Sequence, residues 1–163
     1  MSNRTTRLAI VIAAVVVAAF VAAVAIRAFS GGPGTATKPE YQATVVDVRN
    51  RVDYAYAQVG KATSIKQLAD ALDQASAVVA QGAKDLDHAG VAPGFGDLNG
   101  QLSDKLRQFS GSMADTAAQI RDPSFQPSLG GLNSIGFTEW DDVNAILTKM
   151  KAEGLRVELL QRH

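Results

Sequence analysis

Two residues of the sequence, Asp85 and His88, have the spacing of a metal-binding pair. They lie three positions apart, so a helix would present both on one face, as in carboxylate-bridged metal bundles. Sites of that kind need a second such motif and several inward carboxylates, and the apolar faces of the predicted helices contain no acid. We therefore expect the imidazole of His88 to interact with the carbonyl end of a helix, and we predict no metal ligands.

A second candidate for chemistry is the glycine-rich stretch "GFGDLNG", which contains Gly94, Gly96 and Gly100. Its spacing resembles a dinucleotide-binding loop, but such a loop follows a strand, and here a predicted helix and a proline precede it. We interpret these glycines as loop residues. The chain has no cysteine and no serine in an elbow motif, so we predict no catalytic residues, no cofactor and no enzymatic activity.

Two stretches near the C-terminus are candidates for recognition. The stretch "GFTEWDDVNAIL" holds Trp140, the one tryptophan of the sequence, which we expect in the core, with contact to a partner as the alternative. In "LRVELL" the alternation places Leu155, Val157 and Leu159 on one side. A lone strand cannot complete its own hydrogen-bond ladder, so this tail either packs against the domain or adds to the sheet edge of a partner.

The N-terminal part of the sequence predicts a membrane anchor. Residues 8–26 are nineteen apolar residues between Arg7 and Arg27, and about twenty are needed to cross a bilayer. We predict a cytoplasmic stub over 1–7, a transmembrane helix over 8–29 that contacts lipid, and a flexible linker over 30–39. Because secretory signals have a shorter apolar stretch, we favour an uncleaved signal-anchor, with cleavage after Ser30 as the alternative.

Charge predicts how this anchor is oriented. Arg4 and Arg7 precede the apolar run, which favours a cytoplasmic N-terminus and an extracytoplasmic domain over 40–163. Residues 1–30 hold three of the 16 basic residues and none of the 16 acidic ones, so the remainder has a net charge of −3. Since it has no basic patch, we predict no nucleic-acid partner. A row of small residues in the apolar run is a candidate contact for another transmembrane helix: Ala14, Ala18 and Ala22.

Apolar spacing after residue 40 predicts an all-α fold, namely a small antiparallel bundle of about four helices followed by a short extended C-terminal tail. Ser64 and Gln67 are placed as a capping box for the second helix, and Thr138 is the expected cap of the fourth, which should end at Gly154. The pairs Asp47 with Arg51 and Arg49 with Asp53 are typical of a solvated helix flank. The predicted inward residues of the four helices are Tyr41, Val45, Val48, Val52, Ala55 and Val59; Ile65, Leu68, Leu72, Ala75, Val79, Gly82 and Leu86; Leu98, Leu102, Leu106, Phe109, Met113, Ala117 and Ile120; and Trp140, Val143, Leu147 and Met150.

The second and third helices share an internal similarity at an offset of 34 residues, in which, for example, Leu72 matches Leu106 and Ser76 matches Ser110. A tetratricopeptide array has this period but needs two helices in each repeat. We interpret the matches as two helices of like composition and register, with a duplicated helix as the alternative.

These features together lead to a functional hypothesis. We expect a single-pass bacterial envelope protein whose extracytoplasmic domain binds a protein partner, as an accessory subunit or a scaffold. The alternative is a small-ligand sensor or carrier with a pocket between helices, which would need a separate transducer because the cytoplasmic stub is so short.

Overall fold

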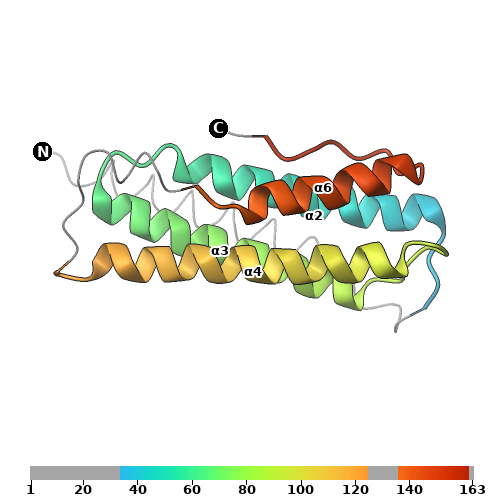
Figure 1. Cartoon of the computed structure of the whole chain (residues 1–163), viewed down its shortest axis with the longest axis horizontal. Coiled ribbons are helices and arrows are strands. Elements are labelled where there is room, and N and C mark those ends of the chain that lie inside the picture. Colours follow the sequence, from blue (N-terminus) through green and yellow to red (C-terminus); the bar gives the residue numbers. More distant parts are fainter. Residues whose placement is uncertain (1–33, 125–135, 162–163) are drawn as a thin grey trace, which may run out of the picture. The chain divides into compact units, whose positions relative to one another are not determined.

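The computed structural model describes residues 34–124 and 136–161, all of which belong to the compact unit Pro33–His163. This part of the chain contains four α-helices and no strands, which confirms the predicted all-α class and the helical bundle. They are α2 (Lys38–Val59), α3 (Ile65–His88), α4 (Gly96–Arg121) and α6 (Glu139–Ala152). Consecutive helices run in opposite directions (Figure 1). The predicted stub, transmembrane helix and alanine row lie outside the described residues.

The starts of the helices differ in detail from the predictions. Helix α2 begins at Lys38, inside the predicted linker, because the Glu40 carboxylate accepts hydrogen bonds from both the backbone N–H and the hydroxyl of Thr37. Thr35 just before it bridges to Val91, so the end of the predicted linker packs on the domain. Ser64 caps α3 as predicted, but the Gln67 side chain accepts from Thr63 rather than completing the box with Ser64.

The start of α6 also departs from its prediction. Thr138 occupies the N-cap position but makes no side-chain capping bond, because its backbone is already helical. The first turn of α6 instead holds three acids, which interact favourably with the positive end of the helix dipole: Glu139, Asp141 and Asp142.

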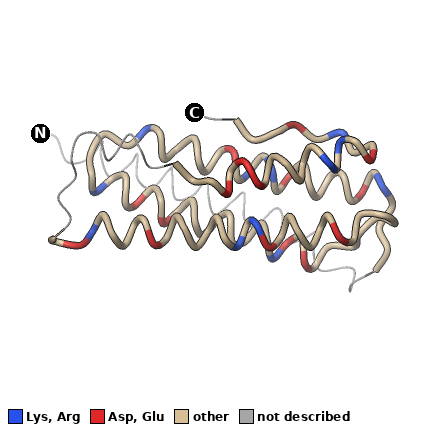
Figure 2. The backbone as a smooth tube through the Cα atoms, viewed as in Figure 1, with Lys and Arg blue, Asp and Glu red and all other residues tan. Residues whose placement is uncertain are grey.

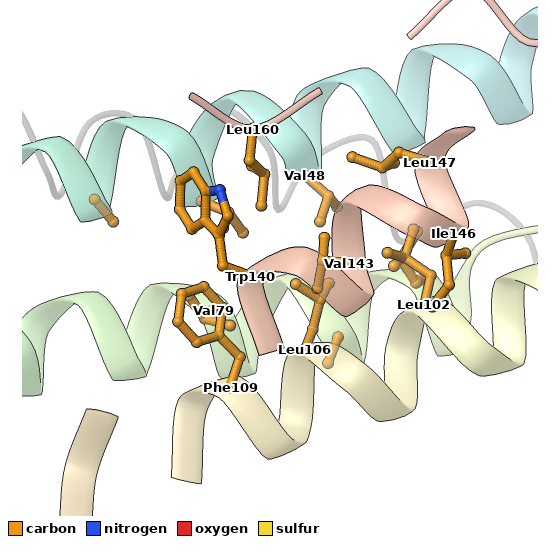
Figure 3. Close-up of a cluster of buried hydrophobic side chains, with 14 of the residues drawn as sticks. Val48, Val79, Leu102, Leu106, Phe109, Trp140, Val143, Ile146, Leu147 and Leu160 are labelled. Carbon is orange, nitrogen blue, oxygen red and sulfur yellow. The ribbon is translucent and has the colours of Figure 1, made fainter. Parts of the chain in front are cut away.

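The core lies where the four apolar faces meet, and it contains most of the predicted inward residues (Figure 3). Four predicted members lie at its margin, since Ile65 is 43% exposed and the other three are half-buried, namely Val59, Leu68 and Leu98. An aromatic group closes one part of the core, with the ring centroids of Tyr56 and Trp140 4.6 Å apart. Phe109 and Phe137 complete this group, which buries Trp140 to 4% exposure.

Helices α3 and α4 form the most extensive contact of the bundle, and the 34-residue similarity lies in that contact. Ser76 and Ser110 exchange hydrogen bonds, each hydroxyl donating to the other residue's carbonyl oxygen at 2.9 and 3.0 Å. Ion pairs flank the crossing on both sides, Asp73 with Arg121 and Asp87 with Arg107, and Figure 2 marks the acidic and basic residues along both helices. Each arginine lies 34 residues after the aspartate of the other pair, since Arg121 follows Asp87 and Arg107 follows Asp73 by this offset. The two ion pairs therefore occupy equivalent positions on either side of the serine crossing.

The bundle is closed on its fourth side by the C-terminal tail. Direct packing is extensive for α2 with α3, α3 with α4 and α4 with α6, but sparse between α2 and α6. After α6 the chain reverses at Gly154, which has a φ of +87°. This conformation allows two backbone hydrogen bonds that end the helix: the Gly154 N–H donates to the Lys151 carbonyl, and the Leu155 N–H donates to the Met150 carbonyl. Residues 155–161 then return in the opposite direction to α6 (Figure 1), and hydrogen bonds join them to both α2 and α6.

Candidate interaction groove between α2 and α6

The space between α2 and α6 is an apolar groove. One wall is α2, with Val45, Val48 and Val52, and the other is α6, with Val143 and Leu147. The floor comes from α4 through Leu102 and Leu106. All seven side chains are at most 2% exposed. Leu160 of the tail lines the same space, so the tail forms one boundary of the groove.

Three tail residues are buried against the domain, and one of them, Leu160, lines this groove. Leu155, Val157 and Leu160 are 2%, 2% and 5% exposed, while Arg156, Glu158 and Leu159 face solvent. The alternation therefore stops after Val157, and the prediction that Leu159 shares one side with Leu155 and Val157 is wrong, since Leu159 is 37% exposed. The physical reason is that hydrogen bonds from the helices fix the orientation of the last residues of the tail. Figure 3 shows Leu160 pointing between α2 and α6, beside Trp140 and Val48.

The main chain of the tail is held by side chains of the two helices. The Asn144 amide accepts from the Leu160 N–H at 2.8 Å and donates to the Leu160 carbonyl at 3.2 Å. From α2, Gln42 Oε1 accepts from the Arg156 N–H at 2.8 Å, and Asp53 Oδ1 accepts from the Gln161 N–H at 2.7 Å. The Arg49 guanidinium donates to the Leu159 carbonyl. The tail therefore runs parallel to α2, and its contacts with these side chains do not depend on its own side-chain identities.

Two of the residues that bind the tail, Arg49 and Asp53, differ in their surroundings from the prediction made from the sequence. The pair of Arg49 and Asp53, 3.7 Å apart, was expected on a solvated flank, yet the two side chains are only 11% and 14% exposed. The tail covers them, because both bind its main chain. Gln42 and Asn144 were not predicted as functional residues. A signal was present, since Gln42, Arg49 and Asp53 recur at intervals of seven and four along one helix face.

Arg51 and Asp85 form a separate ion pair between α2 and α3, at 2.6 Å, with side chains 16% and 19% exposed. Gln81 donates to the other carboxylate oxygen of Asp85, and Asp47 lies 3.0 Å from the Arg51 Nε. The imidazole of His88 instead contacts the Lys84 carbonyl at 2.6 Å. The structure therefore does not bring Asp85 and His88 to one site. No cluster of three metal-ligating side chains occurs within residues 34–124 and 136–161.

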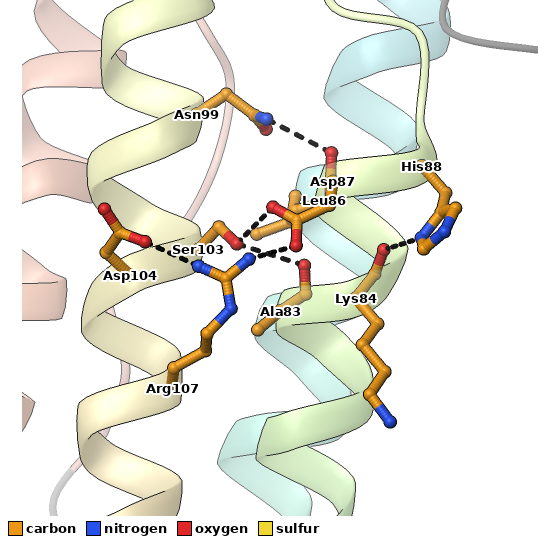
Figure 4. Close-up of polar contacts among 9 residues, drawn as sticks. All are labelled: Ala83, Lys84, Leu86, Asp87, His88, Asn99, Ser103, Asp104 and Arg107. Atoms are coloured by element: carbon orange, nitrogen blue, oxygen red, sulfur yellow. Dashed lines mark hydrogen bonds and ion pairs between the residues drawn. The ribbon is translucent and has the colours of Figure 1, made fainter.

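A polar network lies at the end of the bundle where α3 stops and α4 starts (Figure 4). Asn99 donates to the Leu86 carbonyl at 3.1 Å and accepts from the Tyr41 hydroxyl at 3.0 Å. Tyr41 is fully buried, and this burial raises the pKa of its phenol well above the ordinary value. The network joins three helices through satisfied polar groups, so we interpret it as structural.

Asp87 belongs to the exposed side of the same network. Its partial burial acts to raise its pKa, but hydrogen bonds from the Ser103 hydroxyl and the Arg107 guanidinium, together with the charge of Arg107, hold the pKa below its ordinary value. The carboxylate is therefore stabilised in its ionised form. Such a group ties α3 to α4 and is poorly suited to transfer a proton at neutral pH.

The other residues singled out in the sequence have structural positions. Gly94 lies in the turn before α4 with φ of +88°, and Gly96 and Gly100 belong to the first turns of α4. No strand precedes them in the described part of the chain. Trp140 is buried in the aromatic group, and Leu155 and Val157 are buried between the tail and the helices, so none of the three is exposed in this structure. Ala14, Ala18 and Ala22 lie outside the described residues.

Comparison of the chain with protein-family models, curated proteins and solved structures gives no match. Among the residues that the structure describes, no helix is both long and apolar enough to cross a bilayer. The role of the groove is therefore inferred from its geometry.

Proposed function

We propose that the chain is a single-pass, membrane-anchored envelope protein whose extracytoplasmic helical domain acts by binding another protein, as an accessory subunit or a scaffold, without catalysis. Support for the anchor comes from the sequence, in which nineteen apolar residues over 8–26 follow Arg4 and Arg7. The observation that carries the binding role is the α2–α6 groove, which holds an extended polypeptide segment by its main chain.

The geometry favours protein binding over the small-ligand alternative. The cavity beneath Leu160 has a volume of about 10 Å³ and apolar walls. A space of that size corresponds to about one water molecule, whereas ligand pockets measure several hundred Å³. An apolar groove flanked by polar side chains that bind main-chain groups is suited to an extended peptide.

Purification of the full chain in mild detergent tests this proposal. We expect the protein to elute as a complex, in which mass spectrometry identifies a second envelope protein in a constant ratio. A photo-crosslinking residue at the exposed position Leu159 or Ala114 would then show which face is in contact in intact cells. A monomer without a co-purifying protein, and without a crosslink from either face, would contradict the binding role.

A further inference from the structure

The C-terminal tail is bound to the domain in the way that a separate peptide would be bound. Its three apolar side chains, Leu155, Val157 and Leu160, occupy positions 1, 3 and 6 of the segment and pack into the core, with Leu160 lining the groove. The side chains between them face solvent and make few contacts, such as the exposed ion pair of Glu158 with Lys151 at 3.8 Å. Affinity and register are therefore supplied by the main chain and three anchors.

The residues that bind the main chain are distributed along the whole groove. Gln42, Arg49 and Asp53 follow one face of α2, and Asn144 lies opposite on α6. Asn144 makes two of these main-chain hydrogen bonds, because its amide both accepts from the Leu160 N–H and donates to the Leu160 carbonyl. Any extended segment presents N–H and carbonyl groups with this spacing, so these contacts are available to a segment of another protein.

The connection of the tail to the domain allows it to be exchanged. Gly154 ends α6 with its own backbone bonds, so the helix is complete without residues 156–161. The tail makes no strand ladder, and its link to α6 is one exposed glycine with φ of +87°. Opening at this point would expose the apolar walls of the groove without breaking any of the four helices.

We propose that the α2–α6 groove is a binding site for an extended segment of a partner protein with apolar residues at positions 1, 3 and 6, of the type Leu-x-Val-x-x-Leu, and that the tail occupies this site until the partner displaces it. This inference rests on the proposed protein-binding function and specifies the site and the chemistry of the partner. The main-chain contacts determine register, and burial in the core selects apolar side chains at the three anchor positions.

Fluorescence anisotropy with a labelled peptide of residues 155–163 tests the site in the full chain. In the wild type the attached tail competes at high effective concentration, so peptide affinity should be low. Leu160→Asp should release the tail and strengthen peptide binding by about tenfold or more. The matched control is Leu159→Asp, which changes the neighbouring exposed residue and should bind the peptide as weakly as the wild type.

Recognition of the main chain is tested with N-methylated peptides. Methylation at Leu160 removes the N–H that donates to Asn144 and should weaken binding to Leu160→Asp by about tenfold. Methylation at Glu158, whose N–H donates to no described residue, is the matched control and should have little effect. Asn144→Leu in the Leu160→Asp chain should reproduce the loss.

Several outcomes would overturn the inference. One is an absence of peptide binding by a Leu160→Asp chain that keeps its helical circular dichroism and a cooperative melt. Another is equal binding of both methylated peptides. A wild-type dimer that dissociates on Leu160→Asp substitution would identify the occupant as the tail of a second copy, and not a separate partner. If the peptide does not bind while a photo-crosslinking residue at position 114 still crosslinks to a partner, the groove is excluded as the binding site. Protein binding through another face of the domain would then remain as the function.

Hydrogen exchange of the wild-type chain gives a test that needs no substitution. The Leu160 amide should exchange through local opening, much faster than amides in the centres of α3 and α4. Exchange of Leu160 only on global unfolding would show that the tail does not leave the groove, and the inference would be wrong.

Discussion

At the scale of single residues, Gly82 determines how closely α2 and α3 approach. A Cβ atom at this position would lie 2.9 Å from Val48 Cγ1, and Val48 is a buried, β-branched residue with little rotamer freedom in a helix. Gly82→Ala should therefore lower the free energy of unfolding by about 1–3 kcal/mol, because the helices must separate. Gly111 is the matched control, since it lies in α4 with nothing within 4 Å of an added Cβ. Gly111→Ala should raise stability by up to about 1 kcal/mol through helix propensity. Urea denaturation measures both, and equal effects would contradict the close approach.

The carboxylate of Asp87 should make stability depend on pH. Its pKa is lower in the folded protein than in the unfolded chain, because bonds from Ser103 and Arg107 outweigh its burial. The stabilisation is therefore present above the ordinary aspartate pKa of about 3.9 and is lost as pH falls through the folded value. Asp87→Asn should reduce the loss of unfolding free energy between pH 6 and pH 3, measured by urea denaturation. Asp115→Asn, at an exposed position of α4, should follow the wild type. Parallel curves for wild type and Asp87→Asn would contradict the role of this carboxylate.

At the scale of the elements, the helices could be predicted from the sequence and the groove could not. A helix buries one face at a period that the sequence displays, so Tyr41 to Ala55 and Leu102 to Ile120 were placed correctly. The tail has no such period, because its register is set by Asn144 and Arg49 from distant parts of the chain. Polar residues on the flank of a helix have the same sequence pattern whether they face water or a segment that covers them, so the pattern predicts a solvated flank in both cases. Gln42, Arg49 and Asp53 do share one helix face, but this spacing alone does not distinguish a covered face from a solvated one.

The contact between α3 and α4 leads to a prediction about Ser76 and Ser110. Each hydroxyl donates to the carbonyl of the other helix, and the two oxygens are 3.0 Å apart. Ser76→Ala and Ser110→Ala should each lower the free energy of unfolding by about 1 kcal/mol. The double substitution should cost less than the two together, by about 0.5 kcal/mol, because residues in one hydrogen-bond network are coupled and alanine favours the helix. A double-mutant cycle from chemical denaturation measures this coupling, and strict additivity would contradict it.

At the scale of the whole molecule, the described domain is a bundle that uses its own C-terminal segment as a structural element. Three sides are closed by direct helix packing and the fourth by a tail that four helix side chains hold. The link between this domain and a membrane rests on the sequence, where apolar residues over 8–26 have the length of a bilayer span. In the proposed arrangement the groove faces the extracytoplasmic side, where it would meet partners of the envelope.

The proposed topology can be tested because the sequence contains no cysteine. Single cysteines at Asn3 and at Ala114, an exposed residue of α4, provide one label site on each side of the predicted span. A membrane-impermeant maleimide should label Ala114→Cys in intact cells, and should label Asn3→Cys only after the membrane is permeabilised, because the positive charges of Arg4 and Arg7 favour a cytoplasmic N-terminus. Labelling of Asn3→Cys and not Ala114→Cys in intact cells would show the opposite orientation. If the mature chain never carries the Asn3 label even after permeabilisation, the segment has been removed, and cleavage after Ser30 replaces the anchor.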